Sequence, residues 1–366
     1  MTVPTPGPEP TSGPEPTPGP EPTSGPEPTS GPETPPASPG QRGPGSDDPS
    51  SRSSATAAFA DRLAAAVGRT ASATCVGLDP RFDSLPGPIR RGISADRPDG
   101  MAAAYLQFCT EIIDAVRDLV PCVKPQAAFF EQLGPAGSVA LGEVIRHAVS
   151  AGLLVILDGK RNDIGSTATA YAEAYLDARE RRRWASDALT VSPYLGGDSL
   201  EPFVTACDRN DAGIFVLVKT SNPGGGDLQD RPADGLPLYR HVAAMVNRLN
   251  RDRVGECGYG PVGAVVGATY PDQLAELRAA MPQSWILIPG FGAQGGGPGD
   301  VAAGFDAHGR GAIVNNSRHL IFAYRRDEYR QRFGEDRWQD AVRAATAEMN
   351  DTLASVVKPD GRPLAR

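Results

Sequence analysis

The chain has 366 residues, enough for one large domain or two small ones, and a net charge of −8 at pH 7. Most of this charge belongs to residues 1–50, which hold seven acidic residues and one Arg, so the rest is nearly neutral and offers no basic field for nucleic acid. No apolar run reaches the roughly 18 residues that a membrane span requires, so we expect no membrane contact.

Residues 1–54 form a distinct segment dominated by Pro, Gly, Glu, Ser and Thr, with a glutamate at every sixth position from Glu9 to Glu33. Collagen requires Gly at every third position, so this repeat does not predict a triple helix. Because the segment has almost no apolar side chains to offset the entropy of ordering, we expect a disordered tail. It also lacks the apolar stretch of a secretory signal. Residues 55–366 are then the folded domain.

The number and spacing of cysteines and histidines indicate the cellular compartment and the capacity for metal binding. The five cysteines are scattered and contain no Cys-x-x-Cys pair, which favours reduced thiols in the cytoplasm over a disulfide framework. The four histidines form no His-x-His or Cys/His cluster. The sequence therefore predicts no zinc site built from protein ligands.

After the tail, strand-like apolar runs alternate with helical patterns. An Ala-rich helix is expected first, at residues 56–67. Eight apolar runs follow, at residues 73–78, 122–124, 153–157, 188–191, 214–218, 262–266, 285–288 and 312–314. Helical patterns lie between most of them, at residues 101–119, 138–150, 167–183, 200–208, 238–251, 271–280 and 300–308, and a last helix spans 340–357.

The eight runs are apolar throughout, which is typical of strands buried on both faces of a parallel sheet. Eight β/α units in about 290 residues predict an α/β fold, a single-domain (β/α)8 TIM barrel. The alternative is an open doubly wound sheet, which usually has fewer strands and a Gly-x-Gly-x-x-Gly turn after the first. Here Asp79-Pro80-Arg81 follows the first run and cannot make that turn.

The most informative stretch follows the third run, where residues 157–163 read Leu-Asp-Gly-Lys-Arg-Asn-Asp. Asp158 and Lys160 are two apart and point to the same side of a strand, and Asp163 follows where the strand gives way to a loop. Burying charge is costly unless it is paired. A structural salt bridge would meet this condition, but the position at a strand end favours chemistry.

Other runs also end on polar residues. They are Asp79, Lys124, Lys219 to Asn222, and Asn315 to Arg318. Any one of them could cap a helix or be solvated. In a closed parallel barrel, however, all these ends meet at one rim, where TIM-barrel active sites lie.

The last two strand ends predict a phosphate site. Gly290, Gly292 and the glycines at 295–297 would let backbone N–H groups approach an anion, and a helix beginning near Gly299 or Asp300 would add its positive end. The planar fork of Arg318 matches a phosphate, and the loops after strands seven and eight are the usual phosphate site of this barrel. The alternative is a flexible Gly linker beside a surface Arg. The stretch 292–299 is also a candidate lid.

Lysines and aspartates that face the end of a substrate away from its phosphate can catalyse a reaction at carbon. An ammonium can stabilise negative charge that develops on carbon and then deliver a proton to it. A carboxylate nearby can repel a leaving carboxylate or orient the lysines. These are the requirements of decarboxylation followed by protonation.

At these residues the chain resembles the orotidine 5′-phosphate decarboxylase family, most closely its bacterial type 2 branch. The resemblance covers residues 70–325 and rests on ordered motifs at 77–80, 123–126, 158–167, 193–198, 218–223, 289–296 and 315–318. The Asp-x-Lys-x-x-Asp element alone is shared across a wider barrel superfamily, whereas the ordered set is specific. The resemblance implies cofactor-free conversion of orotidine 5′-phosphate to UMP and CO2, the last step of de novo pyrimidine biosynthesis.

The resemblance also implies residue roles. Asp79 and Lys124 would hold the ribose hydroxyls, with Lys124 linked to the carboxylate network. Asp158 would lie near the leaving carboxylate, and whether it strains the ground state or organises the lysines stays open. Lys160 would stabilise and protonate the carbon that carbon dioxide leaves.

Two residues are implied to act across a homodimer, since Asp163 and Thr167 would reach into the partner subunit's site. Ser221 would contact the pyrimidine, with Thr220 as an adjacent candidate. The phosphate would be bound by Gln294, Arg318 and the backbone near Gly292.

Three other functions are alternatives. A sugar-phosphate decarboxylase or aldolase of the same superfamily would need an acidic Mg²⁺ ligand where Lys124 stands, and an ammonium would repel a dication. A Schiff-base aldolase would need a depressed pKa of Lys160 or Lys219, whereas neighbouring aspartates favour the charged form of Lys160. A non-catalytic scaffold would recruit partners through polyproline recognition of the tail. The sequence assigns no role to residues 227–237 or to the stretch after Tyr324.

Overall fold

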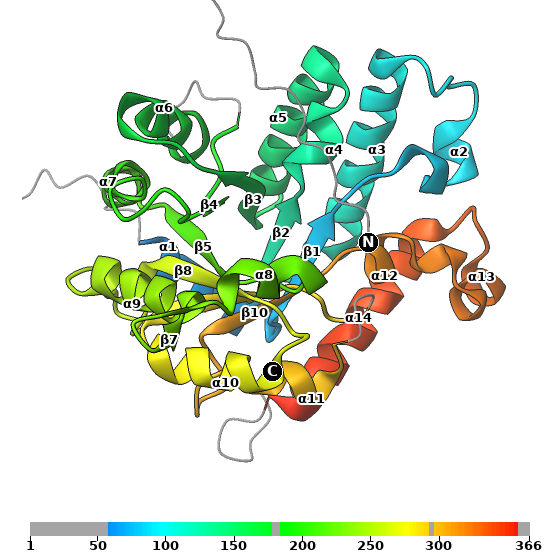
Figure 1. Ribbon diagram of the computed structural model, residues 1–366. Coiled ribbons are helices and arrows are strands. Elements are labelled where there is room, and N and C mark those ends of the chain that lie inside the picture. Colours follow the sequence, from blue (N-terminus) through cyan, green and yellow to red (C-terminus); the bar gives the residue numbers. More distant parts are fainter. Residues whose placement is uncertain (1–57, 178–183, 293–295, 358–366) are drawn as a thin grey trace, which may run out of the picture. The chain divides into compact units, whose positions relative to one another are not determined.

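The computed structural model describes residues 58–177, 184–292 and 296–357, and these contain a closed barrel of parallel strands in the order β1-β10-β9-β8-β5-β4-β3-β2 (Figure 1). The strands are β1 (Thr74–Leu78), β2 (Cys122–Pro125), β3 (Leu154–Arg161), β4 (Ala188–Val191), β5 (Gly213–Lys219), β8 (Gly260–Val266), β9 (Ser284–Ile288) and β10 (Ala312–Asn316). Each coincides with one of the eight apolar runs, so the predicted TIM barrel is confirmed and the open doubly wound sheet is wrong.

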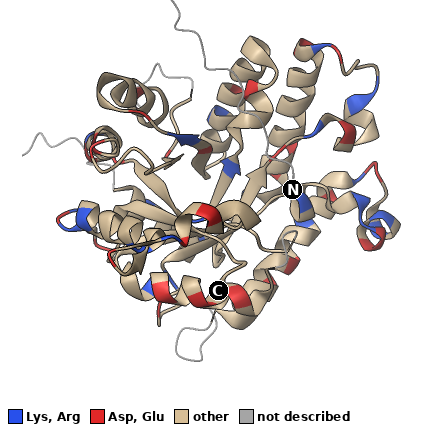
Figure 2. Ribbon diagram, viewed as in Figure 1, with Lys and Arg blue, Asp and Glu red and all other residues tan. Residues whose placement is uncertain are grey.

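Helices surround the strands of the barrel (Figure 1). The longer ones are α1 (Phe59–Thr70), α3 (Pro98–Val116), α5 (Gly134–Ser150), α6 (Gly165–Leu176), α7 (Glu201–Asn210), α9 (Leu238–Asn250), α10 (Pro271–Ala280) and α14 (Trp338–Val356). Short helices are α2 (Gly87–Arg90), α4 (Ala127–Glu131), α8 (Gly226–Gln229), α11 (Pro298–Ala302), α12 (Arg318–Ile321) and α13 (Asp327–Phe333). Figure 2 shows that charged residues lie mainly on these helices and the loops and that few lie in the strands.

Most expected helices are confirmed with shifted ends, but two differ in extent. The helix expected at 300–308 ends at Ala302, because the chain turns at Gly304, where an added β-carbon would lie 2.5 Å from the side chain of Ile288. The helix expected at 167–183 ends at Leu176, and residues 178–183 lie outside the described part.

The chain divides into two units, residues 1–53 and residues 54–366, and the second contains the barrel. The tail expected at residues 1–54 lies outside the described residues. All five cysteines lie in the barrel unit and are free thiols. Within the described ranges, no helix is both long and apolar enough to cross a membrane.

The barrel interior and α1 share one apolar core. Phe59 and Leu63 of α1 are buried with inward-facing strand residues such as Phe215 and Trp285. The rings of Phe59 and Phe215 meet edge to face at a centroid distance of 6.0 Å. A second, larger core between the strands and the surrounding helices holds the alternate strand residues, including Val216.

An excursion of the chain links β5 to α9. It contains α8 and a two-residue hairpin of β6 (Pro232–Ala233) and β7 (Leu236–Pro237), which turns at Asp234 and Gly235, both in the left-handed region. The ring Nε2 of His241 on α9 lies 2.8 Å from the carbonyl oxygen of Ala233 and ties the hairpin to that helix. The excursion contains the residues 227–237 to which the sequence assigned no role.

Candidate active site

The carboxyl end of β3 is irregular, and this irregularity brings the side chains of Asp158 and Lys160 into contact. Pairing with β4 shifts register between Leu157 and Arg161. Within this bulge, Lys160 has a φ of +45°, a left-handed conformation that is uncommon for a residue with a side chain. The expected placement of Asp158 and Lys160 on one side is confirmed, but it depends on this bulge as well as on strand alternation.

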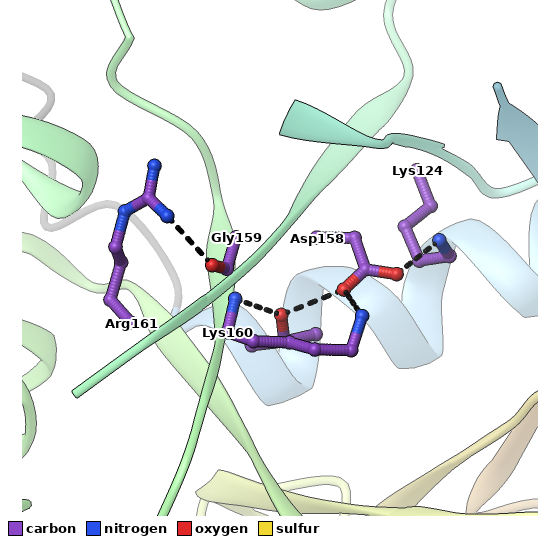
Figure 3. A network of polar contacts seen from close by, with 6 residues as sticks. Lys124, Asp158, Gly159, Lys160 and Arg161 are labelled. Atoms are coloured by element: carbon purple, nitrogen blue, oxygen red, sulfur yellow. Dashed lines mark hydrogen bonds and ion pairs between the residues drawn. The ribbon is translucent and has the colours of Figure 1, made fainter. Parts of the chain in front are cut away.

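Three charged side chains from two neighbouring strands form a chain of contacts (Figure 3). Lys124 of β2 donates from Nζ to Oδ2 of Asp158 at 2.6 Å, and Lys160 donates to Oδ1 of the same carboxylate at 2.5 Å. The two lysines differ in exposure, since 5% of the Lys124 side chain is accessible and 48% of the Lys160 side chain. The network therefore has a buried, fixed ammonium on one side of the carboxylate and an accessible ammonium on the other.

The environment keeps these groups charged. Burial alone would raise the pKa of Asp158, but the charges and hydrogen bonds of Lys124 and Lys160 outweigh it and hold this pKa well below its usual range. Burial would likewise lower the pKa of Lys124, but the charges of Asp158 and Asp79 raise it above its usual range. At neutral pH the site therefore contains a carboxylate between ammonium groups.

Thr190 of β4 is a member of this network that the sequence did not reveal. Its hydroxyl accepts the backbone N–H of Lys160 at 2.9 Å and donates to Oδ1 of Asp158 at 3.0 Å. The residue is buried within an apolar run, so it reads as a core position. One hydroxyl thus fixes both the backbone of Lys160 and the carboxylate.

Arg161 braces the same bulge from its other side. It donates to the carbonyl oxygen of Gly159 at 2.9 Å, as Figure 3 shows, and to the hydroxyl of Tyr175 at 3.0 Å. It also forms an ion pair with Glu131 of α4 and lies over the rings of Tyr171 and Tyr175. These contacts draw the Arg161 side chain away from Asp158 and into the helix layer.

Asp79, directly after β1, completes the rim beside Lys124. Its strand β1 pairs with β2 so that Gly77 lies opposite Lys124, and its charge contributes to the raised pKa of Lys124. Its Oδ1 is buried and has no hydrogen-bond partner within the described residues. A buried carboxylate oxygen without a partner is costly, and a ligand hydroxyl would satisfy it.

Asp163 and Thr167 lie beyond the network. The carboxylate of Asp163 accepts the backbone N–H of Ile164 at 2.9 Å, and among the described residues it forms no ion pair with Lys124 or Lys160. Thr167 is exposed in the first turn of α6. The structure thus brings together three of the four charged residues predicted as a catalytic set.

At the end of β5, Ser221 lies against the segment after β8. Its carbonyl oxygen accepts a hydrogen bond from the hydroxyl of Thr269 at 3.3 Å. A β-carbon placed on Gly267 would lie 2.8 Å from the Cα of Ser221, so only glycine permits this approach. The adjacent Thr220 bonds Gln229 and Asn222, and its side chain is thereby occupied.

The two loops predicted to bind phosphate are in contact. A β-carbon on Gly292, whose φ is +75°, would lie 2.7 Å from Nδ1 of His319 and 3.5 Å from Nδ2 of Asn316. Arg318, between these two residues, begins α12 and is exposed. Burial lowers the pKa of His319, and the nearby charges of Arg326 and Arg318 lower it further. Gln294 lies outside the described residues, as do residues 293 and 295 of the expected lid.

Together these residues place the lysine–aspartate network at β2 to β4 and the two loops that hold Gly292 and Arg318 after β9 and β10. The described residues contain no group of three His, Cys, Asp or Glu side chains placed to hold a metal ion.

A family model for the orotidine 5′-phosphate decarboxylase / HUMPS family matches residues 74–328, which include every strand of the barrel. The chain belongs to this family. The orotidine 5′-phosphate decarboxylase of Rhodopirellula baltica is 67% identical over 297 residues, which cover 81% of this chain and 98% of that protein. The family match spans all the site residues described above, from Asp79 to Arg318.

Solved structures of the family have the same fold. The orotidine monophosphate decarboxylase of Leishmania donovani is 36% identical with a TM-score of 0.63, over 82% of this chain and 98% of that one. Leishmania donovani UMP synthase is 37% identical with a TM-score of 0.65, but this chain spans only 57% of its length. The similarity therefore reaches one part of that longer protein.

Proposed function

We propose that the protein catalyses the cofactor-free decarboxylation of orotidine 5′-phosphate to UMP and CO2, the last step of de novo pyrimidine biosynthesis, in the cytoplasm. The observation that carries this proposal is the contact of both Lys124 and Lys160 with a single buried carboxylate at the carboxyl rim of the barrel. Membership of the decarboxylase family supports the choice of substrate.

In the proposed reaction, the carboxylate of the substrate lies beside Asp158. The carbon–carbon bond breaks, CO2 leaves, and the electron pair stays on the pyrimidine carbon. The ammonium of Lys160 stabilises this charge and then transfers its proton to that carbon, and because Lys160 is half exposed it is reprotonated from water. Lys124 and Thr190 keep Asp158 ionised and in place, so no reorganisation is needed at the moment of reaction.

Substrate binding is proposed to use groups remote from the reacting carbon. The unpartnered oxygen of Asp79 would accept a ribose hydroxyl, and Ser221 would contact the base. Arg318 and the backbone near Gly292, with Gln294, would bind the phosphate. Such remote binding energy can be used to orient the substrate against Lys160.

We also propose a homodimer in which Asp163 and Thr167 complete the partner subunit's site. Support comes from large apolar side chains that are exposed, since Ile164, next to Asp163, is 56% exposed and Tyr194, after β4, is 74% exposed. Exposed apolar side chains that form a contiguous patch mark an interaction surface. Asp163 itself makes no ion pair with the described residues of its own subunit's lysine network, so it is free to serve another.

The structure favours this function over a Schiff-base aldolase. Lys160 forms an ion pair with Asp158, and Lys219 is completely buried in an ion pair with Asp230. Neither amine is placed to attack a carbonyl as a neutral nucleophile.

The deciding experiment is an assay of orotidine 5′-phosphate turnover in EDTA, with wild type, Lys160→Ala and Arg343→Ala compared. We expect Lys160→Ala to lower kcat by at least about 100-fold while still binding UMP, because a general acid is lost but the binding groups stay. Arg343→Ala breaks a surface ion pair with Asp118 and should leave kcat unchanged. Substantial turnover by Lys160→Ala would refute the proton donor. No turnover by well-folded wild type would refute the substrate.

A further inference from the structure

Lys219, the last residue of β5, is a completely buried ammonium outside the lysine–aspartate network. Its Nζ donates to Oδ1 of Asp230 at 2.6 Å. It also lies 4.5 Å from the ring centroid of Tyr270 and 5.7 Å from that of Tyr239. A buried charge is tolerated only when paired, and aromatic faces add cation–π attraction, so these contacts fix the position of Lys219.

The ion pair closes a loop in the chain. Asp230 directly follows α8, so its bond to Lys219 ties the start of the excursion after β5 to a point eleven residues later. A second tie runs parallel to it, because Gln229 accepts the backbone N–H of Thr220 at 3.0 Å and donates to the Thr220 hydroxyl at 2.8 Å. We call these contacts between residues 219–220 and 229–230 the latch.

Ser221 lies inside the closed loop, one residue beyond the latch. Its other support is the segment after β8, where Gly267 allows close approach and Thr269 bonds its carbonyl oxygen. Tyr270, whose ring lies 4.5 Å from the Lys219 ammonium, belongs to the same segment. The latch and the support of Ser221 are therefore one connected assembly.

We propose that Lys219 and Asp230 are positioning residues that hold Ser221 in register with the base of the bound nucleotide, so that the latch sets affinity for the pyrimidine and not for the phosphate. This inference rests on the proposed function, which assigns Ser221 to the base. It gives residues 227–237 a role, since they deliver Asp230 to Lys219.

The main test variant is Lys219→Met, and two further variants complete a double-mutant cycle. Met has a similar length and suits the tyrosine rings, and Asp230 is 45% exposed, so it stays hydrated when Lys219 is absent. Asp230→Asn alone leaves a buried ammonium without its counter-charge and should lower the melting temperature most. The double variant, which has neither charge, should recover much of that loss. Arg253→Met, which breaks the exposed ion pair with Asp208, is the matched control.

Binding of two ligands distinguishes recognition of the base from recognition of the phosphate. In Lys219→Met and in the double variant, we expect the Kd for UMP to rise about tenfold, the effect of one lost hydrogen bond, while the Kd for ribose 5-phosphate changes less than twofold. The control should change neither. Equal weakening of both ligands, or unchanged UMP binding, would overturn the proposal.

Hydrogen exchange of the Thr220 amide gives a readout that needs no ligand, because this N–H donates to Gln229 within the latch. It should exchange at least about tenfold faster in Lys219→Met than in wild type. Unchanged exchange would show that the ion pair does not hold the loop. If exchange is faster in Lys219→Met but wild type binds no UMP, the latch is supported as a structural feature. The proposed function is then refuted instead.

Discussion

At the scale of single residues, the backbone of Lys160 is the unusual feature. A left-handed conformation costs a residue with a side chain about 1–3 kcal/mol, and such cost persists only where the surroundings determine it. Here Thr190 holds the Lys160 N–H and Arg161 holds the preceding carbonyl. The bulge converts an alternating strand into a platform on which the ammonium of Lys160 meets the carboxylate of Asp158.

Removal of the Thr190 hydroxyl should therefore affect the chemical step. In Thr190→Val, a change of similar shape, we expect kcat to fall about tenfold or more with little change in KM, because two hydrogen bonds that orient Lys160 and Asp158 are lost. Thr190→Ser retains the hydroxyl and should keep most of the rate. Steady-state kinetics of both variants check this, and an equal loss in Thr190→Ser would point to packing instead.

Protonation of Asp158 should control stability only in strong acid. Its folded-state pKa is depressed, so its pairing stabilises the fold above the unfolded pKa of about 3.9 and the benefit is lost as pH falls toward the lower folded value. We expect the difference in free energy of unfolding between wild type and Asp158→Asn to be constant from about pH 5 to 8 and to shrink below about pH 4. Denaturant titrations across this range measure it, and a transition near neutrality would contradict the depressed pKa.

At the scale of elements, α1 packs against the inward-facing strand residues and does not belong to the helix layer around the barrel. Phe59 lies so close to β5 that a β-carbon on Gly213 would be 2.2 Å from its ring. Arg62 of α1 also forms an ion pair with Asp187 and donates to the carbonyl oxygen of Asp211, both next to strand starts. The helix therefore belongs to the amino-terminal end of the strands, opposite to the rim that carries the site.

Loss of the Phe59 side chain should therefore separate stability from activity. In Phe59→Ala we expect the free energy of unfolding to fall by about 3–5 kcal/mol, because a fully buried ring leaves a cavity. The kcat of the remaining folded enzyme should be unchanged, since the lysine network lies at the other end of the strands. Denaturation midpoints and kcat measured on the same sample check both halves, and a matching fall in kcat would show coupling between the two ends.

At the scale of the whole molecule, the proposed homodimer makes a quantitative claim. Lys160→Ala and Asp163→Ala each remove one half of a site that two subunits share. In a mixed dimer both changes fall in one site and the other is intact, so an equal mixture of the inactive variants should recover about a quarter of wild-type activity. Assays after co-refolding test this. No recovery, with mixed dimers demonstrated, would place Asp163 in its own subunit's site.

The barrel could be predicted from the sequence because its strands are buried on both faces and so appear as continuous apolar runs. The charged members of the network could also be predicted, since Asp158 and Lys160 directly follow such a run. Thr190 could not, because a hydroxyl inside an apolar run has the pattern of a core residue. The pairing of Lys219 with Asp230 could not be predicted either. It depends on the path of the chain through residues 220–237, which the hydrophobic periodicity of the sequence does not indicate. The short helix α4, which supplies Glu131 to Arg161, lies below the length at which a helical period is visible.

The site draws on the barrel in two groups that are separated along the chain. Lys124, Asp158 and Thr190 come from the consecutive strands β2, β3 and β4, whereas the residues proposed to bind phosphate follow β9 and β10. Asp79 follows β1, which pairs with β2 on one side and with β10 on the other, so the seam that closes the barrel runs between the groups. A nucleotide held by both groups would bridge this seam as a non-covalent staple. Its binding energy would then resist the parting of the first and last strands, and the barrel would be hardest to open when it is occupied.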